Sequence, residues 1–345
     1  MKYFREFPSN PSFFDGKSIL ITGATGSFGS NLLKTLLTKT GTERIVVYSR
    51  DELKQYELQL ELQSMPDATS RTRFFIGDVR DQQRLEMALF GIDYVVHAAA
   101  LKQVTTAEYN PFECLHTNVI GAENVVRASL NAGVKRIVAL STDKAANPIN
   151  LYGASKLASD KLFIAANNLG RPKGCVFSVA RYGNVMGSRG SVIPLFQKLI
   201  ADGADHLPIT DERMTRFWIT LGQGVSFVMS CLETMSGGEI FVPKIPSMRM
   251  TDVATALAPD LPQKVVGLRP GEKLHEVMVP ADDAPNTVEL EDRYVILPPV
   301  SPYWPSHRFE RLRAEGKACP SDFQYSSDRN SEWLQPDDLG DWLAR

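Results

Sequence analysis

The 345-residue sequence has no excess of charge of one sign, because 38 lysines and arginines face 40 aspartates and glutamates. A broad nucleic-acid or anionic-membrane surface needs surplus cations to neutralise phosphates, so a formal net charge of −2 disfavours both partners. The sequence also lacks an apolar run of about 18 residues, the length of a membrane span. Its N-terminus, MKYFREFPSNPSFFDG, lacks the apolar core of a secretory signal. We therefore expect a cytoplasmic protein that acts on small metabolites.

Cysteine is scarce and scattered. The four cysteines lie dozens of residues apart, at Cys114, Cys175, Cys231 and Cys319. No C-x-x-C pair and no neighbouring histidine cluster is present, which excludes a zinc-ribbon pattern and argues against a disulfide framework. We expect isolated, reduced thiols and no metal site.

Short β-branched runs alternate with amphipathic stretches in the first half of the chain. Continuous apolar strands of this kind are buried on both faces, and their alternation with helices predicts a Rossmann-type, doubly wound parallel sheet of the α/β class. In the helix at 52–63, we expect Leu53, Tyr56, Leu60 and also Leu58 to face inward. The predicted strands are 17–22, 44–48, 73–76, 94–98 and 136–140, and the predicted helices are 27–38, 52–63, 81–90 and 119–132.

The pattern changes after residue 186, which suggests a second, smaller unit. Helices are expected at 193–201, 222–234 and 251–258, the last with Thr251 as its N-cap, and a strand at 239–243. The predicted organisation is an N-terminal arm (1–16), a first domain (17–186) to which 219–243 returns, a C-terminal subdomain that is mainly substrate-binding (187–297), and an extension (298–345) with little fold signal.

The first predicted strand runs into a glycine-rich turn. Glycines let the backbone bend sharply and approach a pyrophosphate, which then rests at the positive N-terminus of the following helix. The readable strand before the turn and the helix after it predict dinucleotide binding by domain 17–186. The residues of this turn assigned to the cofactor are Gly23, Thr25, Gly26, Ser27, Phe28 and Gly29.

The end of the second predicted strand distinguishes the two nicotinamide cofactors. An NAD enzyme places a carboxylate there for the ribose 2′-hydroxyl, whereas a 2′-phosphate needs cations and hydrogen-bond donors. Here Ser49 and Arg50 occupy the tip, with Lys54 one helical turn further on. Asp51 is free to cap the next helix instead. The sequence therefore predicts NADP.

A strip of polar residues follows the fifth predicted strand, at Ser141-Thr142-Asp143-Lys144, and Tyr152-x-x-x-Lys156 comes shortly after it. A tyrosine and a lysine four residues apart share one helix face. The ammonium is expected to lower the pKa of Tyr152, making it a base for a sugar hydroxyl, and to hold the nicotinamide ribose. This arrangement predicts hydride chemistry.

Together these features resemble the extended, sugar-nucleotide-modifying branch of the short-chain dehydrogenase/reductase family. The spacing G-x-x-G-x-x-G, the pair Asp78-Val79, the turn His97 to Ala100, and Asn118-x-x-Gly121-x-x-Asn124 all carry the resemblance. It extends from about residue 16 to 297 and includes the string Arg181 to Val185. The resemblance implies that Asp78, Val79, Ala98 and Val185 contact the cofactor.

The pair Asp143-Lys144 indicates which group of enzymes within the family the chain resembles. Retaining sugar-nucleotide dehydratases of the family have Asp-Glu there, whereas Asp-Lys resembles the inverting UDP-N-acetylglucosamine 4,6-dehydratases of pseudaminic acid biosynthesis. The implied roles are removal of the C5 proton by a neutral Lys144, proton donation to the C6 oxygen by Asp143, and hydrogen bonding to the sugar by Thr142. Burial and the nearby Lys156 are expected to lower the pKa of Lys144.

The implied substrate is UDP-N-acetylglucosamine, and its nucleotide end needs phosphate-binding arginines. Arg269 to Lys273 resembles the family's Arg-x-Gly-Glu-Lys segment, while Lys102 to Thr106 departs from the expected His-Val-Pro after the lysine. The substrate-contact candidates are Lys102, Asn184, Arg189, Thr210, Met214, Arg216, Arg269 and Glu272.

Two alternatives remain open. One is a UDP-N-acetylhexosamine 4-epimerase or retaining 4,6-dehydratase, against which Asp143-Lys144 argues. The other is a non-catalytic NADP-binding regulator, against which the intact Tyr152 and Lys156 argue. The resemblance also implies a homo-oligomer, namely a hexamer.

Overall fold

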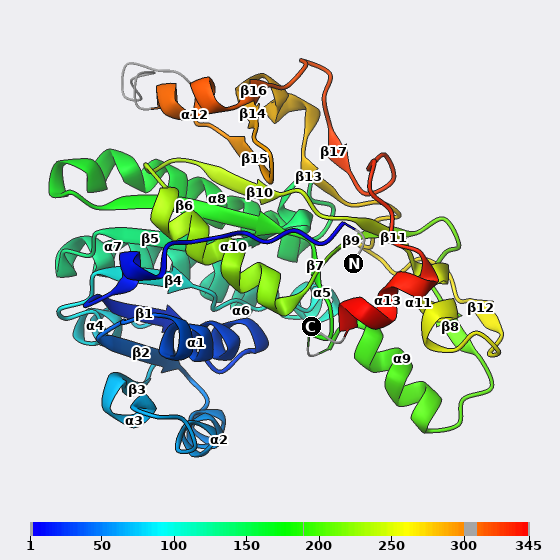
Figure 1. Ribbon diagram of the computed structural model, residues 1–345, viewed down its shortest axis with the longest axis horizontal. Helices are drawn as coiled ribbons and strands as arrows, with labels where there is room; N and C mark the ends of the chain where they lie inside the picture. Colours follow the sequence, from blue (N-terminus) through cyan, green and yellow to red (C-terminus); the bar gives the residue numbers. More distant parts are fainter. Residues whose placement is uncertain (1–2, 189, 300–308, 344–345) are drawn as a thin grey trace.

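A long sheet runs through the computed structural model, which describes residues 3–188, 190–299 and 309–343 (Figure 1). Its parallel part confirms the predicted Rossmann-type sheet: successive strands are added on one side from β1 to β3 and on the other side from β4 onward, and β1 pairs in parallel with β4 at this switch point. The strand order is β3 (Thr72–Ile76), β2 (Arg44–Ser49), β1 (Ser18–Thr22), β4 (Tyr94–His97), β5 (Arg136–Thr142), β6 (Val176–Tyr182) and β10 (Ile240–Pro243).

Helices cover both faces of this sheet. On one face, α1 (Ser27–Lys39) packs against α10 (Leu221–Thr234), and on the other α4 (Gln82–Ala88), α7 (Gly121–Ala132) and α8 (Leu151–Gly170) pack side by side (Figure 1). The parallel strands β1, β2 and β4 to β6 are almost wholly buried, as their unbroken apolar runs predict. The buried sheet thus gives fixed positions to the loops at its strand ends, which form the site.

The sheet continues beyond β10 with antiparallel strands that the sequence did not reveal. These are β15 (Arg293–Ile296), β14 (Thr287–Glu289) and β16 (Lys317–Ala318), next to η5 (Ala281–Asn286) and α12 (Glu310–Glu315). Part of the 298–345 segment therefore joins the main sheet. A further pair, β13 (Val277–Val279) with β17 (Tyr325–Ser326), ties the tail to the segment that precedes it.

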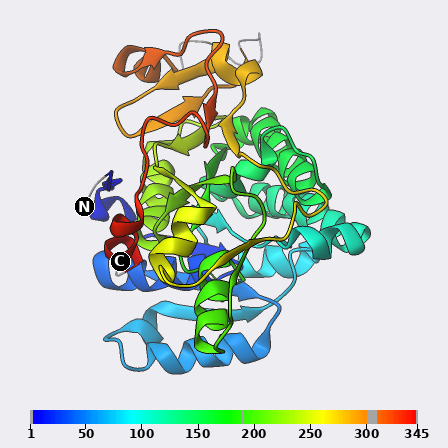
Figure 2. The same ribbon diagram turned by 90° about the vertical axis from the view of Figure 1, so that its right-hand side faces the viewer.

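A second hydrophobic core lies beside the sheet. Its shell consists of β7 (Asn184–Val185), β8 (Leu207–Ile209), β9 (Thr215–Ile219), β11 (Ser247–Arg249), β12 (Gln263–Val265), α9 (Val192–Ala201), α11 (Met250–Leu257) and α13 (Pro336–Leu343). The two ends of the chain meet here, since the rings of Phe4 and Trp342 lie 5.8 Å apart (Figure 2). The N-terminal arm, which includes η1 (Pro11–Phe14), also buries Phe7 in the main core.

Two local predictions are wrong. In α2 (Glu52–Leu62) Leu58 is buried as expected, but the side chains of Leu53, Tyr56 and Leu60 are exposed. Gln55 is buried in their place, because its amide donates to the carbonyls of Ser49 and Phe75. Thr251 is not an N-cap. The helix α11 begins one residue earlier, at Met250, because the buried Met250 donates its N–H to the carbonyl of Met214 and Arg249 ends β11.

Short elements complete the description. They are α3 (Ala68–Arg71), α5 (Val104–Tyr109), α6 (Pro111–Leu115), the π-helical turn η2 (His116–Ile120), η3 (Asp143–Ala145) and η4 (Arg171–Lys173). None of the described helices combines the length and apolar character needed to cross a membrane. No cluster of metal-ligating side chains occurs in the described ranges, and the four cysteines are unpaired thiols.

Candidate active site

A cavity of about 560 Å³ opens at the carboxyl ends of the parallel strands, where ligands of such sheets bind. Every residue assigned to the cofactor lines it. From the glycine turn these are Gly23, Thr25, Gly26, Ser27, Phe28 and Gly29; from the following strand ends they are Ser49, Arg50, Lys54, Asp78, Val79, Ala98 and Val185; and from α8 they are Tyr152 and Lys156.

The glycine turn is shaped for a ligand that approaches the backbone closely. Gly23 has a φ of 66°, and a Cβ at this position would lie 2.8 Å from the backbone nitrogen of Ala99. A Cβ on Gly29 would lie 2.5 Å from Cα of Ala24. The N-terminus of α1 carries no side-chain cap, so its N–H groups face the cavity and suit a pyrophosphate. The turn therefore fits a dinucleotide.

The far end of this cavity is polar and cationic. Ser49 accepts a hydrogen bond from Gln55 at 3.1 Å, and Arg50 lies 3.5 Å from Asp78. Asp51 caps α2 by accepting from the backbone N–H of Lys54 at 3.0 Å, and its other oxygen pairs with the Lys54 ammonium at 2.7 Å. Asp51 thus caps the helix, as the sequence suggested, and its charge is also paired with Lys54.

The family-like asparagines hold the floor of the cavity. Asn118 bonds both backbone groups of Leu101, and Asn124 donates to the carbonyl of Val79 at 3.0 Å. His97 is buried, which lowers its pKa to about 3, and it bonds the Thr22 hydroxyl at 2.8 Å. These side chains therefore have a structural role.

That strip brings the predicted catalytic residues together. Thr142 ends β5, Asp143 and Lys144 form η3, and Tyr152 and Lys156 lie on the first turns of α8. Lys156 is buried and donates to the carbonyl of Leu140 at 2.7 Å, which fixes its ammonium beneath the cavity. Burial raises the pKa of Tyr152 to about 12, against opposing effects of Lys144 and Thr142. The expectation of a lowered tyrosine pKa is therefore wrong for the chain without ligands.

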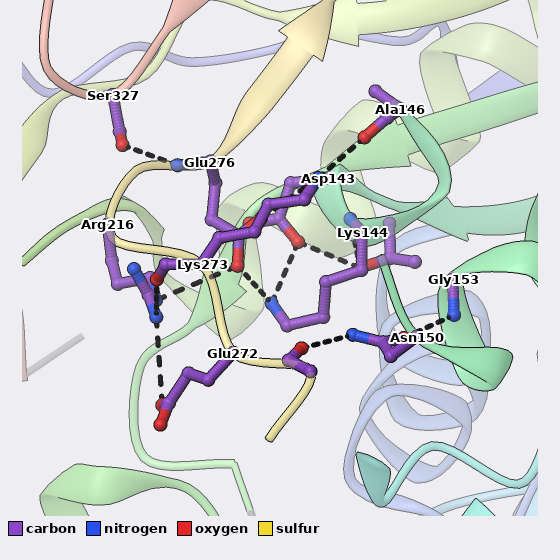
Figure 3. A network of polar contacts seen from close by, with 12 residues as sticks. Asp143, Lys144, Ala146, Asn150, Gly153, Arg216, Glu272, Lys273, Glu276 and Ser327 are labelled. Carbon is purple, nitrogen blue, oxygen red and sulfur yellow. Dashed lines mark hydrogen bonds and ion pairs between the residues drawn. The ribbon is translucent and has the colours of Figure 1, made fainter. Parts of the chain in front are cut away.

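The amino group of Lys144 lies between two carboxylates (Figure 3). Its Nζ is 3.0 Å from Oδ1 of Asp143 and 3.2 Å from Oε1 of Glu276. Burial lowers the pKa of Lys144, but the attraction of Asp143 and Glu276 outweighs it and raises the pKa above its ordinary value. The predicted lowering is thus wrong, because it left out the attraction of the adjacent Asp143, to which the fold adds that of Glu276.

Asp143 lies behind Lys144 rather than on a cavity wall. Its side chain is 1% exposed, and Oδ1 accepts hydrogen bonds from the Thr142 hydroxyl at 2.9 Å and from Lys144. Thr142 and Lys144 line the cofactor cavity, whereas Asp143 is absent from the linings of both large cavities. Any proton that Asp143 supplies must therefore pass through these two neighbours.

A second cavity of about 550 Å³ meets the first at Lys144 and contains the substrate-contact candidates. Arg216 is buried and donates to the carbonyls of Lys273 and Leu274, and it lies 3.7 Å from Glu272. Arg189 lies outside the described residues. The other candidates all line this cavity: Lys102, Asn184, Thr210, Met214, Arg216, Arg269 and Glu272.

The segment 269–276 is docked onto the catalytic strip. Asn150 donates to the carbonyl of Gly271 at 2.7 Å, and Lys273 donates to the carbonyl of Ala146 at 2.7 Å (Figure 3). Sequence reasoning missed Lys273 and Glu276 as site residues. The only available signal was their place within and just after the Arg-x-Gly-Glu-Lys segment.

Gly153 allows this close docking, which yields a prediction. A Cβ at Gly153 would lie 2.2 Å from the carbonyl oxygen of Lys144. We expect Gly153→Ala to push η3 away from α8, lowering the free energy of unfolding by about 1–3 kcal/mol and reducing turnover. Chemical denaturation and rate measurements check this. Gly222→Ala, where a Cβ meets nothing within 4 Å, is the control; equal stability of both variants would contradict the argument.

Comparisons with known proteins agree with this geometry. Residues 19–298 match the family described as "Polysaccharide biosynthesis protein". The UDP-N-acetylglucosamine 4,6-dehydratase (inverting) of Campylobacter jejuni subsp. jejuni serotype O:23/36 (strain 81-176) is 54% identical over 330 residues, covering 95% of this chain and 97% of the relative. The UDP-glucose 4-epimerase of Rickettsia prowazekii (strain Madrid E) is 42% identical and covers 82% and 83%.

Solved structures show the same fold. Pen from Bacillus thuringiensis superimposes with a TM-score of 0.86 at 33% identity, covering 96% of this chain and 98% of that one. DesIV, a dTDP-glucose 4,6-dehydratase from Streptomyces venezuelae with NAD and TYD bound, gives 0.66 at 25% identity, with coverage of 74% and 86%. The chain therefore belongs to the polysaccharide biosynthesis protein family, an extended family of short-chain dehydrogenases/reductases, and is an enzyme.

Proposed function

We propose that this chain is a UDP-N-acetylglucosamine 4,6-dehydratase, a hydro-lyase that inverts C5. The observation that carries the proposal is the amino group of Lys144 at the junction of the two cavities, beside Tyr152. The Campylobacter jejuni relatives that carry this name support it. The product would be UDP-2-acetamido-2,6-dideoxy-β-L-arabino-hex-4-ulose, in line with a place in pseudaminic acid biosynthesis.

The chain's own residues move the protons of this reaction. Tyr152 takes the C4 hydroxyl proton, and Lys156, held by the Leu140 carbonyl one helical turn away on α8, would stabilise the tyrosinate once the ligands are bound. A bound nicotinamide would supply the hydride chemistry, namely oxidation at C4 and reduction at C6. The C4 ketone acidifies C5, from which Lys144 removes the proton. Asp143 supplies a proton to the C6 oxygen by way of Thr142 or Lys144, and loss of water leaves a C5–C6 double bond. As hydride returns to C6, a proton is delivered to the opposite face of C5, which completes the product and inverts C5.

The pair Asp143–Lys144 can reach the required protonation state without exchanging protons with solvent. One proton moving from Nζ of Lys144 to Oδ1 of Asp143 along their 3.0 Å contact converts ammonium and carboxylate into amine and carboxyl. The raised pKa of Lys144 makes this transfer uphill in the resting chain. The neutral amine is then a strong base, because the carboxylate of Glu276 still stabilises the ammonium that forms when it takes the C5 proton.

Product analysis tests the proposed function. The chain is incubated with UDP-N-acetylglucosamine in D₂O, and the product is examined by NMR. A 4-keto-6-deoxy sugar with deuterium at C5 and inverted C5 stereochemistry is expected. A product without deuterium at C5 would contradict the scheme. A C4 epimer that keeps its 6-hydroxyl group would support the 4-epimerase alternative, since the Rickettsia relative is named as a 4-epimerase.

The cofactor is proposed to be NADP. The polar tip at Ser49, the cation Arg50 and the neutralised Asp51 support a 2′-phosphate, although DesIV is described with NAD. We expect Ser49→Ala/Arg50→Ala to raise the Kd for NADP by about 10–100-fold, as loss of charge-assisted hydrogen bonds does, and to leave the Kd for NAD within about threefold. Titration of both cofactors checks this, and intact NADP preference would refute it.

A homo-oligomer, specifically a hexamer, is proposed as well. The exposed apolar side chains of Tyr109, Phe112, Leu115 and Ile120 on α5, α6 and η2 support self-association, since soluble monomers seldom expose such groups together. Light scattering after size-exclusion chromatography should give a mass of six chains. A monomeric mass across the working concentration range would overturn it.

A further inference from the structure

Glu276 is a buried carboxylate on the wall of the second cavity, outside the set that the sequence identified. Its residue surface is 1% exposed. Three cations surround it: Nζ of Lys144 at 3.2 Å, Nε of Arg216 at 3.8 Å and Nζ of Lys273 at 3.9 Å (Figure 3). Its Oε2 accepts no hydrogen bond from the part of the chain that the structure describes. Lys144 is therefore its nearest charged neighbour.

The backbone of Glu276 is clamped by the C-terminal tail. Its N–H donates to Oγ of Ser327 at 2.9 Å, and its carbonyl accepts from the N–H of Ser327 at 2.8 Å. Ser327 in turn bonds the Thr215 hydroxyl on β9 at 2.7 Å. With its backbone fixed from two sides, the carboxylate has a defined position from which to hold Lys144.

The charges that face Lys144 come from four parts of the fold. Asp143 lies beside it in η3, Tyr152 on α8, Arg216 on β9, and Glu276 with Lys273 on the segment before β13. Both carboxylates favour the ammonium form, whereas Arg216 opposes it. Asp143 is the neighbouring residue in the chain, so Glu276 is the long-range contact that fixes the amine from its other side.

We propose that Glu276 is a positioning residue, which anchors the amino group of Lys144 at the junction of the two cavities and keeps it protonated in the resting enzyme. The role of Glu276 in catalysis rests on the proposed function, in which Lys144 removes the C5 proton. Because Glu276 also faces Arg216, a candidate for the substrate diphosphate, one carboxylate joins the nucleotide end of the site to its reacting end.

The titration of Lys144 tests this proposal without reference to turnover. The full-length chain is pulse-labelled with acetic anhydride across a pH series, and labelling of each lysine is measured by peptide mass spectrometry, because only the neutral amine reacts. A carboxylate within about 4–6 Å shifts a pKa by about 1–3 units, so Glu276→Gln should raise Lys144 labelling at fixed pH by about 10–1000-fold. Unchanged Lys144 labelling would overturn the proposal.

Matched variants separate charge from shape. Glu272→Gln removes a carboxylate from the same cavity that pairs with Arg216, and it should leave Lys144 labelling within about twofold, because no contact joins Glu272 to Lys144. Glu276→Asp keeps the charge and should shift labelling less than Glu276→Gln. A large increase in the Glu272→Gln variant would show that general cavity charge, rather than Glu276, controls Lys144 and would overturn the proposal.

If Glu276→Gln fails to fold, a second variant tests whether Glu276 holds the Lys144 amine. Ser327→Ala removes the hydroxyl that holds the Glu276 backbone and leaves every charge in place. It should raise Lys144 labelling in the same direction but by less, and no change would count against the proposal. Product NMR of the unmodified chain is run in parallel: absence of a dehydrated product defeats the proposed function, whatever the labelling shows, and a normal product with unmoved labelling defeats only the role of Glu276.

Discussion

Lys144→Met is expected to lower the rate of dehydration by about 10²–10⁴-fold, the usual contribution of a positioned acid–base group. The variant loses the amine that lines both cavities and also contacts Asp143. In the proposed mechanism this amine reaches C5. Because Tyr152 and Lys156 remain, the first oxidation should still proceed. The reduced nicotinamide should therefore accumulate in absorbance measurements, while NMR shows no 6-deoxy product.

The same substitution leaves two buried carboxylates without their shared cation. Removing one partner of a buried ion pair costs about 3–5 kcal/mol, so Lys144→Met should also unfold more easily. Lys144→Met/Glu276→Gln also removes one of these two carboxylates and should recover part of that stability but none of the activity. Recovery of dehydration in the double variant, or full dehydration in the single one, would show that the amine is not the base.

Tyr152→Phe should reduce turnover by about 10²–10⁴-fold as well, but at an earlier step. Without the phenol oxygen nothing accepts the C4 hydroxyl proton, so neither reduced nicotinamide nor dehydrated sugar should form. The ring of Tyr152 is 8% exposed and the phenylalanine keeps its packing, so the free energy of unfolding should change little. Absorbance and NMR on both variants distinguish the steps, and accumulation of reduced nicotinamide in Tyr152→Phe would contradict the role of Tyr152.

The sheet and the cofactor turn were predictable because their signals are local. Unbroken apolar runs mark strands buried on both faces, and three glycines between a strand and a helix mark a pyrophosphate turn. The inward face of α2 was predicted wrongly, because Gln55 finds carbonyl partners on β2 and β3 that hydrophobicity alone does not reveal. A polar residue with such partners is buried in preference to the apolar residues beside it.

The residues of the candidate site also fall into those that local sequence predicts and those that only the fold reveals. Tyr152 and Lys156 follow from spacing on one helix, whereas Glu276 and Lys273 reach Lys144 and Ala146 only through tertiary folding. Both pKa expectations failed: the pKa of Lys144 is raised first by the adjacent Asp143 and then by Glu276, which is remote in sequence, and the pKa of Tyr152 is raised by burial. Order in the described part of the tail was also missed, because β17 depends on pairing with β13.

The clamp of Ser327 on Glu276 has a consequence for biosynthesis. Chains emerge from the ribosome N-terminus first, and domains generally fold in that order. The glycine turn and the strands that lead to Asp78 and Thr142 can therefore assemble first, while the support for the Lys144 amine awaits Ser327, which is translated after them. A nascent chain would thus acquire the shape of its nucleotide pocket well before it becomes competent for proton abstraction.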